Sequence, residues 1–247
     1  MKKFLLYFIN HFSDMKTKII TFLLVLCATA VTAKTHKSSS VVSLDPFKSV
    51  FVIGNKNTEV ILSQESQCQL EIEGCAVNDV KIETSDSILL ISTMHLDSVM
   101  PIQLRISSPA YEQLHCSFVR MLISKDTLKS EELSVSAACT NINLSISANF
   151  LQLKFLEGTS ATLAGRCNNA DLTCYGFNRN GRYIFDANQL LVNNMHIDCG
   201  VLSDIRINVT DSLWISDGID SKVDVLGSPI IPENKLKWSE LYLHYKR

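Results

Sequence analysis

The second half of the chain carries a glycine at a nearly regular interval. The spacings are 18, 24 and 18 residues, and the glycines are Gly158, Gly176, Gly200 and Gly218. Each glycine follows a short run with apolar residues at alternate positions, such as 151–155, and precedes another, such as 161–163. A period of about 20 residues is typical of stacked-repeat architectures, and alternation on period two is typical of strands with one buried face. The sequence therefore predicts an all-β fold of stacked, strand-forming units.

Two architectures could use so many short strands. A barrel or sandwich needs hairpin turns, for which Asn180-Gly181 and Asp217-Gly218 are suitable dipeptides, but the other units lack one. In a parallel β-helix, each coil of roughly 20 residues pairs with the next coil, and a glycine at each corner adopts positive φ. The absence of proline between Pro109 and Pro229 also suits a continuous ladder. These observations favour the parallel β-helix with short coils.

The domain boundaries follow from the same patterns. Residues 34–44 look like a flexible lead-in, residues 45–231 form the β-helix domain, and residues 232–247 break the pattern as a tail or cap. No segment has an apolar period of 3.6 residues over helical length. Before the repeat, the strands expected from alternation and flanking turn residues are 50–53, 59–62, 69–72, 80–82, 88–91 and 102–106.

The first 33 residues have the organisation of a secretory signal. Lys16 and Lys18 precede an apolar run, 19–27, and small residues follow up to Ala33. Met15 suits the start of such a signal better than Met1, so residues 1–14 are interpreted as an upstream extension. The run is too short for a membrane span, and Leu26 before Cys27 argues against lipidation. We expect an exported protein of the periplasm or cell surface, with no transmembrane span in the mature chain.

Charge and cysteine content narrow the classes further. Removing residues 1–33 leaves 19 basic and 24 acidic residues, which gives no electrostatic footprint for nucleic acid or an anionic membrane. The odd number of cysteines, several of them near the recurring turn, favours free thiols stacked in the interior. Disulfides Cys68–Cys75 and Cys167–Cys174 remain open alternatives. The mature chain has seven cysteines: Cys68, Cys75, Cys116, Cys139, Cys167, Cys174 and Cys199.

Metal or thiol chemistry has little support. Alternation puts His196 and Asp198 on one face of a strand and Cys199 on the other, so these residues and Cys174 make an awkward metal site. His115 and Cys116 are neighbours on a strand and point to opposite faces, which argues against a nucleophile with its base. We expect no metal and no cofactor.

Catalytic motifs are missing, and the acidic residues of the repeat are scattered singly. Asp198 and Asp217 occupy nearly equivalent turn positions, which is the best indication of an enzyme, although turn chemistry explains both. Tyr175 and Phe177 flank a corner, where exposed aromatic rings could bind a ligand. They are the candidate binding residues, and no catalytic residue is predicted.

Several patterned segments resemble one known family. The corners at Gly158, Gly200 and Gly218, the closing segment 223–230 and the opening strands within 47–62 are similar to those of the putative auto-transporter adhesin head domain, the GIN domain. The resemblance spans about residues 44–231 and rests on patterned positions rather than on a catalytic signature. The chain departs from the family pattern in lacking glycine at the first two corners and in its cysteine content. It implies a right-handed, single-stranded parallel β-helix on exported bacterial proteins and, through the family's name, adhesion. It transfers no functional residue.

The resulting hypothesis is an exported, non-catalytic adhesin or envelope recognition module that binds a glycan or an envelope or host protein. A rigid, extended ladder suits repeated shallow polar contacts. The alternative is a carbohydrate-active enzyme, a polysaccharide lyase or hydrolase, on the same scaffold, which would need a cleft with at least two close carboxylates. Homo-oligomers through the ends or flanks of the β-helix also fit the sequence.

Overall fold

The computed structural model describes residues 39–96, 100–156, 158–175, 183–199, 203–217, 221–232 and 242–246. The chain divides into two units, 1–37 and 38–247, and every described residue belongs to the second. The expected signal segment and most of the tail therefore lie outside the described residues. No helix among the described residues is long and apolar enough to cross a membrane.

The described part is all-β, as the sequence predicts, and its only helical element is the 3₁₀ turn η1 (Val77–Asp79). The strands of the N-terminal half agree with the expected segments to within a few residues. All strands belong to one sheet. They are β1 (Ser39–Ser43), β2 (Ser49–Ile53), β3 (Thr58–Gln64), β4 (Gln69–Glu73), β5 (Lys81–Ser85), β6 (Ile88–Ser92), β7 (Ile102–Ser108), β8 (Gln113–Ser117), β9 (Met121–Ser124), β10 (Leu128–Ala138), β11 (Asn141–Leu156), β12 (Ser160–Cys174), β13 (Tyr183–Cys199), β14 (Ser203–Asp217), β15 (Lys222–Gly227) and β16 (Tyr242–Lys246).

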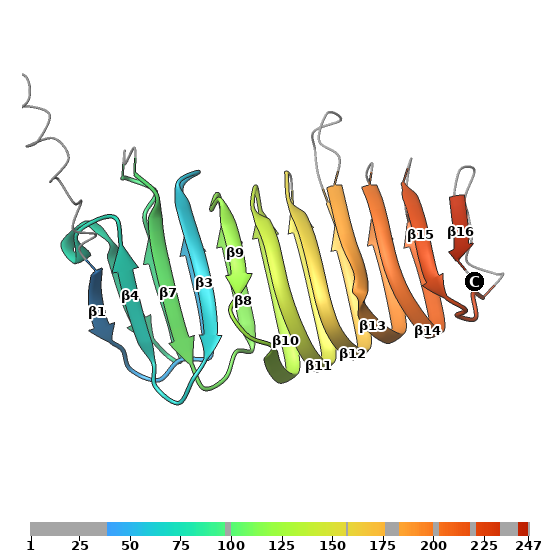
Figure 1. Ribbon diagram of the computed structural model, residues 1–247, viewed down its shortest axis with the longest axis horizontal. Helices are drawn as coiled ribbons and strands as arrows, with labels where there is room; N and C mark the ends of the chain where they lie inside the picture. Colours follow the sequence, from blue (N-terminus) through green and yellow to red (C-terminus); the bar gives the residue numbers. More distant parts are fainter. Residues whose placement is uncertain are drawn as a thin grey trace, which may run out of the picture. The chain divides into compact units, whose positions relative to one another are not determined.

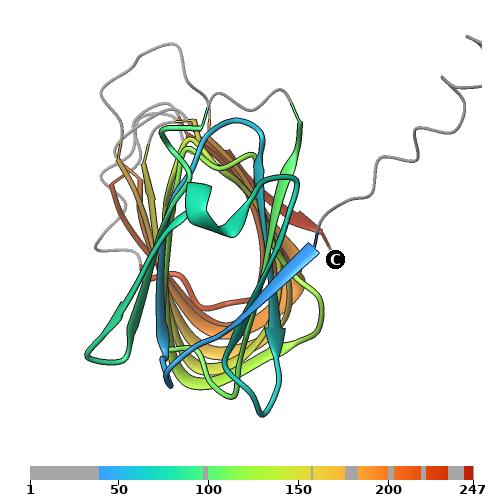
Figure 2. The same ribbon diagram turned by 90° about the vertical axis from the view of Figure 1, so that its left-hand side faces the viewer.

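The sheet curls, so that the long strands run along one side, bend, and continue along the other (Figures 1 and 2). The β3 side consists of β4, β7, β3 and β9 with the first parts of β11 to β14 and β15. The β2 side consists of β6, β2, β8 and β10 with the second parts of β11 to β14. Each long strand thus combines two of the short runs that the sequence shows.

Strands β10 to β16 are parallel to their neighbours, which confirms the expected parallel ladder in this half. In this ladder Leu153 pairs with Leu172, Leu172 with Ile197, and Ile197 with Ile215. All four side chains point inward and are at most 2% exposed. Each buried aliphatic side chain of this size contributes about 1.5–3 kcal/mol, so these stacked rows supply the main stabilisation of the sheet.

Amide side chains stack where the long strands bend. Asn168 Nδ2 donates to Asn149 Oδ1 at 2.8 Å, and Asn193 Nδ2 donates to Asn168 Oδ1 at 3.3 Å. The paired residues are 19 and 25 positions apart in the sequence, and each pair joins two adjacent strands of the ladder. Bends of successive strands therefore lie over one another, and hydrogen bonds between identical side chains hold their register.

The N-terminal part departs from a simple parallel stack. Strand β2 pairs with both β6 and β8, and β3 pairs with both β7 and β9, so β2 and β3 are inserted between strands that follow them in the chain. Beyond β7 and β6, the pairs β4–β7, β1–β4 and β5–β6 are antiparallel. Short antiparallel strands therefore form both edges of this end, and β5 carries charged residues, which discourages pairing with other chains. Residues 39–43, expected in the lead-in, form β1.

Candidate binding surfaces

The described surface has a groove of about 480 Å³ on the β3 side, here called the N-terminal groove. Strand alternation builds it, because the outward-facing residues of neighbouring strands line up in register. Val41 pairs with Glu71, Glu71 with Arg105, and Arg105 with Ile61. Residues from strands distant in the sequence therefore meet in one row. The residues that define the groove are Val41, Ile61, Glu65, Glu71, Arg105 and Lys125.

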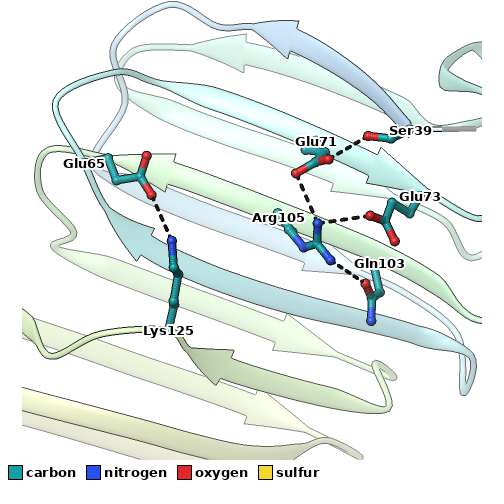
Figure 3. Close-up of polar contacts among 7 residues, drawn as sticks. All are labelled: Ser39, Glu65, Glu71, Glu73, Gln103, Arg105 and Lys125. Atoms are coloured by element: carbon teal, nitrogen blue, oxygen red, sulfur yellow. Dashed lines mark hydrogen bonds and ion pairs between the residues drawn. The ribbon is translucent and has the colours of Figure 1, made fainter.

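Arg105 is the centre of a polar network in the groove (Figure 3). Its Nη1 lies 3.3 Å from Glu71 Oε2 and 3.0 Å from Glu73 Oε1, and its Nη2 donates to Gln103 Oε1 at 3.1 Å. The Ser39 hydroxyl donates to Glu71 Oε1 at 2.6 Å. The Arg105 side chain is 43% exposed, so it is held in place but remains accessible to a ligand.

The second cation of the groove is also paired. Lys125 Nζ lies 3.7 Å from Glu65 Oε1, and both side chains are more than half exposed (Figure 3). Beside these charges, Val41 is 63% exposed and Ile61 is partly buried. The groove therefore offers hydrogen-bonding groups, little net charge and a small apolar surface.

Two wider hollows lie along the bend of the sheet. Their volumes are about 780 and 790 Å³, and both include Lys129, Ser130 and Glu131. The second also includes Asn149 and Asn168, which belong to the amide stack. These two amides already serve the register of the strands, so in the second hollow they are not available for a ligand.

The two candidate binding aromatics have different outcomes. Tyr175 is 52% exposed at the end of β12, and its hydroxyl donates to Asp198 Oδ2 at 3.2 Å. Phe177 lies outside the described residues. A binding role for Tyr175 and Phe177 remains a prediction.

Of the four recurring glycines, Gly158 lies within the described residues. Its φ is +66°, in the left-handed region that the sequence predicts for a corner. Gly176, Gly200 and Gly218 lie outside the described residues. The sequence argument overlooked Gly165, which has a φ of +113° within strand β12.

The residues considered for a metal site divide between the two faces of the sheet, as alternation predicts. His196 is outside, with Nδ1 3.8 Å from Asp171 Oδ1 and Nε2 3.0 Å from the Ser216 hydroxyl. Cys174 and Cys199 are fully buried. Among the described residues, no group of three or more His, Cys, Asp or Glu side chains could hold a metal ion.

The neighbours His115 and Cys116 also point to opposite faces. Burial raises the pKa of the Cys116 thiol to about 12, so the thiol is a poor nucleophile at neutral pH. His115 Nδ1 lies 2.9 Å from the Ser136 hydroxyl, and its ring stacks on Phe51 with centroids 5.6 Å apart. Partial burial lowers the pKa of His115, which keeps the ring neutral in this contact.

The cysteines follow the expected pattern only in part. All seven that the structure describes are free, and Cys116, Cys167, Cys174 and Cys199 are buried, whereas Cys139 is exposed. The two disulfides left open by the sequence are excluded by geometry. Cys68 and Cys75 lie at opposite ends of β4, and Cys167 and Cys174 lie along the same strand, β12. Seven residues of extended chain span about 20 Å, whereas a disulfide needs Cα atoms within about 7 Å.

The backbone does align Asp198 with Asp217, which are partners in the β13–β14 ladder.

The N-terminal groove is not evident from local sequence pattern. The one signal for this groove in the sequence is the outward alternation of charge in Glu71, Glu73 and Arg105. Only the strand order shows that these residues meet.

Comparison with known proteins agrees with this architecture. Residues 46–229 match the family described as "Putative auto-transporter adhesin, head GIN domain". The chain belongs to this family. No curated protein sequence matches the chain.

Several solved structures share this fold. A putative adhesin from Bacteroides fragilis superposes with a TM-score of 0.68 at 16% identity, covering 85% of this chain and 93% of that one. A putative adhesin from Parabacteroides merdae gives 0.53 at 16% identity, with 84% and 92% covered. A putative lipid binding protein from Parabacteroides distasonis gives 0.55 at 10% identity, with 86% and 95% covered. At these identities the likeness establishes the fold alone.

Proposed function

We propose that this GIN-domain protein is an exported, non-catalytic recognition module of adhesin type, and that the N-terminal groove binds a neutral glycan. The observation that carries the proposal is the paired charge of the groove. Arg105 is neutralised by Glu71 and Glu73, and Lys125 by Glu65. An uncharged ligand rich in hydroxyl groups can bind such groups without leaving a buried charge unpaired.

The scaffold suits recognition as well. The parallel ladder, with its amide stack and dense interior, is a rigid platform, and we assign it as the right-handed, single-stranded β-helix that the family resemblance implies. Strands β1, β4, β7 and β3 hold the groove in fixed register, so little ordering is needed on binding. The signal-like segment 1–33 and the family support a location in the periplasm or at the cell surface. The net negative charge of the mature chain argues against a nucleic-acid partner.

A carbohydrate-active enzyme is the alternative function. Glu71, in the groove, and Glu73, beside it, both contact Arg105, so two carboxylates do lie close together. Hydrolysis needs one carboxyl group as proton donor and the other as base or nucleophile. Both are instead engaged by the same guanidinium, which suits positioning rather than proton transfer. Release of reducing ends from a polysaccharide by the purified protein would favour the enzyme.

The proposal is tested by screening the full chain against a glycan array and then measuring affinity for the best ligand. Arg105→Ala should weaken binding about tenfold or more, which corresponds to a loss of about 1.4 kcal/mol. Arg206→Ala is the matched control. Arg206 is an exposed arginine on the same side of the sheet, outside the groove, and its Nη1 lies 3.5 Å from Asp186 Oδ2.

Arg206→Ala should fold normally, because an exposed ion pair contributes only about 0–1 kcal/mol. Arg105→Ala also removes the partner of Glu73, whose side chain is 12% exposed, so circular dichroism is used to show that this variant is folded before its binding is measured. Equal binding by the two variants would refute the assignment of the groove. Binding to an envelope or host protein and to no glycan would refute the ligand class.

A further inference from the structure

Two buried cysteines lie side by side in the parallel ladder. Cys174 is the last residue of β12 and Cys199 the last residue of β13, and the two are direct partners in the register. Both side chains are 0% exposed, so both point into the interior. The neighbouring Cys174 is among the causes that raise the pKa of the Cys199 thiol, as expected for thiols on registered partners that share the interior.

The geometry is compatible with a covalent bond. Neighbouring strands lie about 4.8 Å apart, and Cα atoms joined by a disulfide are usually about 4.4–6.8 Å apart. Partners in a parallel ladder point to the same face, so both sulfur atoms start from the same side of the sheet. The registered neighbours of Cys116 are Val52 and Ala137, so Cys116 has no cysteine beside it in the ladder.

We propose that Cys174 and Cys199 form a disulfide bond that joins β12 to β13 in the exported protein. The reaction converts two thiols into one S–S bond. The two electrons and two protons pass to a disulfide oxidant, either a thiol–disulfide oxidoreductase or a small-molecule disulfide, which is reduced to its dithiol form. The compartment of action rests on the proposed export, because oxidising compartments allow disulfides to persist.

Burial sets the time at which the bond forms. The interaction with Cys174, in which Cys199 keeps its proton as the donor, together with burial raises the pKa of the Cys199 thiol, so the folded protein holds little reactive thiolate there. Oxidation therefore takes place while these strand ends are still open during folding. The same burial afterwards shields the bond from reductants.

The experiment uses the full chain, refolded in a buffer of oxidised and reduced glutathione. Remaining thiols are alkylated under denaturing conditions, and the protein is digested and analysed by mass spectrometry. We expect a linked peptide pair containing Cys199 and Cys174, with the loss of two hydrogen atoms. Fragmentation must show Cys174 linked and Cys167 alkylated, since trypsin leaves these two in one peptide.

Stability provides a second readout. Reduction should lower the urea midpoint of the oxidised protein and of the Cys116→Ala control, which removes a buried thiol without a cysteine neighbour. Reduction should not change the midpoint of Cys174→Ala or Cys199→Ala. The proposal is overturned if both Cys174 and Cys199 are alkylated after oxidative refolding, or if the linked peptide joins other cysteines. Neither result depends on ligand binding, so the recognition function is tested separately by the glycan array.

Discussion

Gly165 allows the clearest test of how the parallel ladder constrains the chain. It pairs with Ile146 across β11 and β12, and its φ of +113° lies in a region that other residues rarely adopt. A Cβ atom at this position would lie 1.9 Å from the Ile146 carbonyl oxygen, where real contacts are essentially never below 3.0 Å. The ladder next to it is irregular, with a register shift between Thr162 and Ala164. Gly165→Ala therefore cannot be accommodated without moving backbone.

The expected cost has two parts. Holding alanine at this φ costs about 1–3 kcal/mol. Relieving the contact with Ile146 separates the two strands locally and removes one or two ladder hydrogen bonds, each worth about 1 kcal/mol. We expect Gly165→Ala to lower the free energy of unfolding by about 2–5 kcal/mol, a large part of the roughly 5–15 kcal/mol typical of a folded domain.

Gly158→Ala is the matched control, because it makes the same substitution at another positive φ. At Gly158 φ is +66°, and the nearest atoms to an added Cβ are the Cα and Sγ of Cys139, both at 3.7 Å. Gly158→Ala should lower the free energy of unfolding only by the cost of a left-handed backbone for alanine, about 1–2 kcal/mol. Urea unfolding followed by far-ultraviolet circular dichroism measures both variants. If Gly165→Ala destabilises no more than Gly158→Ala, the steric argument is wrong.

Three further outcomes follow from the described side chains. Burial raises the pKa of the Cys116 thiol to about 12, whereas Cys139 is exposed. Iodoacetamide at mildly alkaline pH should therefore label Cys139 in the folded protein and Cys116 only after addition of urea. Equal labelling rates of the two cysteines would contradict the buried position of Cys116. The pKa of His115 is lowered by burial, so the unfolded chain binds the proton more tightly, and stability should be intact above about pH 6.5 and fall below it. Urea midpoints across pH should show a smaller acid loss for His115→Gln than for the unmodified protein, and identical pH profiles would remove His115 as the cause. Phe155→Ala should lower the free energy of unfolding by about 3–5 kcal/mol, because it leaves a cavity in the interior. Lys154→Ala, at the exposed neighbouring position, should change it by less than about 0.5 kcal/mol. Comparable losses for the two variants in thermal unfolding would argue against an inward Phe155.

Much of the fold could be predicted from alternation alone. A period of two assigns each residue to a face, and for this reason the buried positions of β11 and β12, and the opposite faces of His196 and Cys199, agree with the structure. Alternation says nothing about which strand lies beside which. The insertion of β2 and β3 between later strands, and the antiparallel strands at the same end, are properties of strand order and were missed.

The same limit explains the outcome for the candidate site. Tyr175 and Phe177 are candidates because they flank a corner, which is information local to the sequence. The N-terminal groove brings Glu71 and Arg105 together from strands more than 30 positions apart, and the hydrogen bond between them exists only in the folded sheet. The pairing of Cys174 with Cys199 likewise depends on the length of the segment between their strands, which sets the register.

The inserted position of β2 and β3 has a consequence for how the protein is made. Strand β2 pairs with β6 along one edge and with β8 along the other, and β3 pairs in the same way with β7 and β9. All four partners are synthesised later. Residues 49–64 must therefore wait, with both hydrogen-bonding edges open, until the chain to about residue 124 is present. Such long-range closure is slow, whereas the later strands can add to a finished edge one at a time. An exported chain that emerges from its N-terminus would need protection during this interval, and the cysteines near the far end of the ladder would be the last to be enclosed.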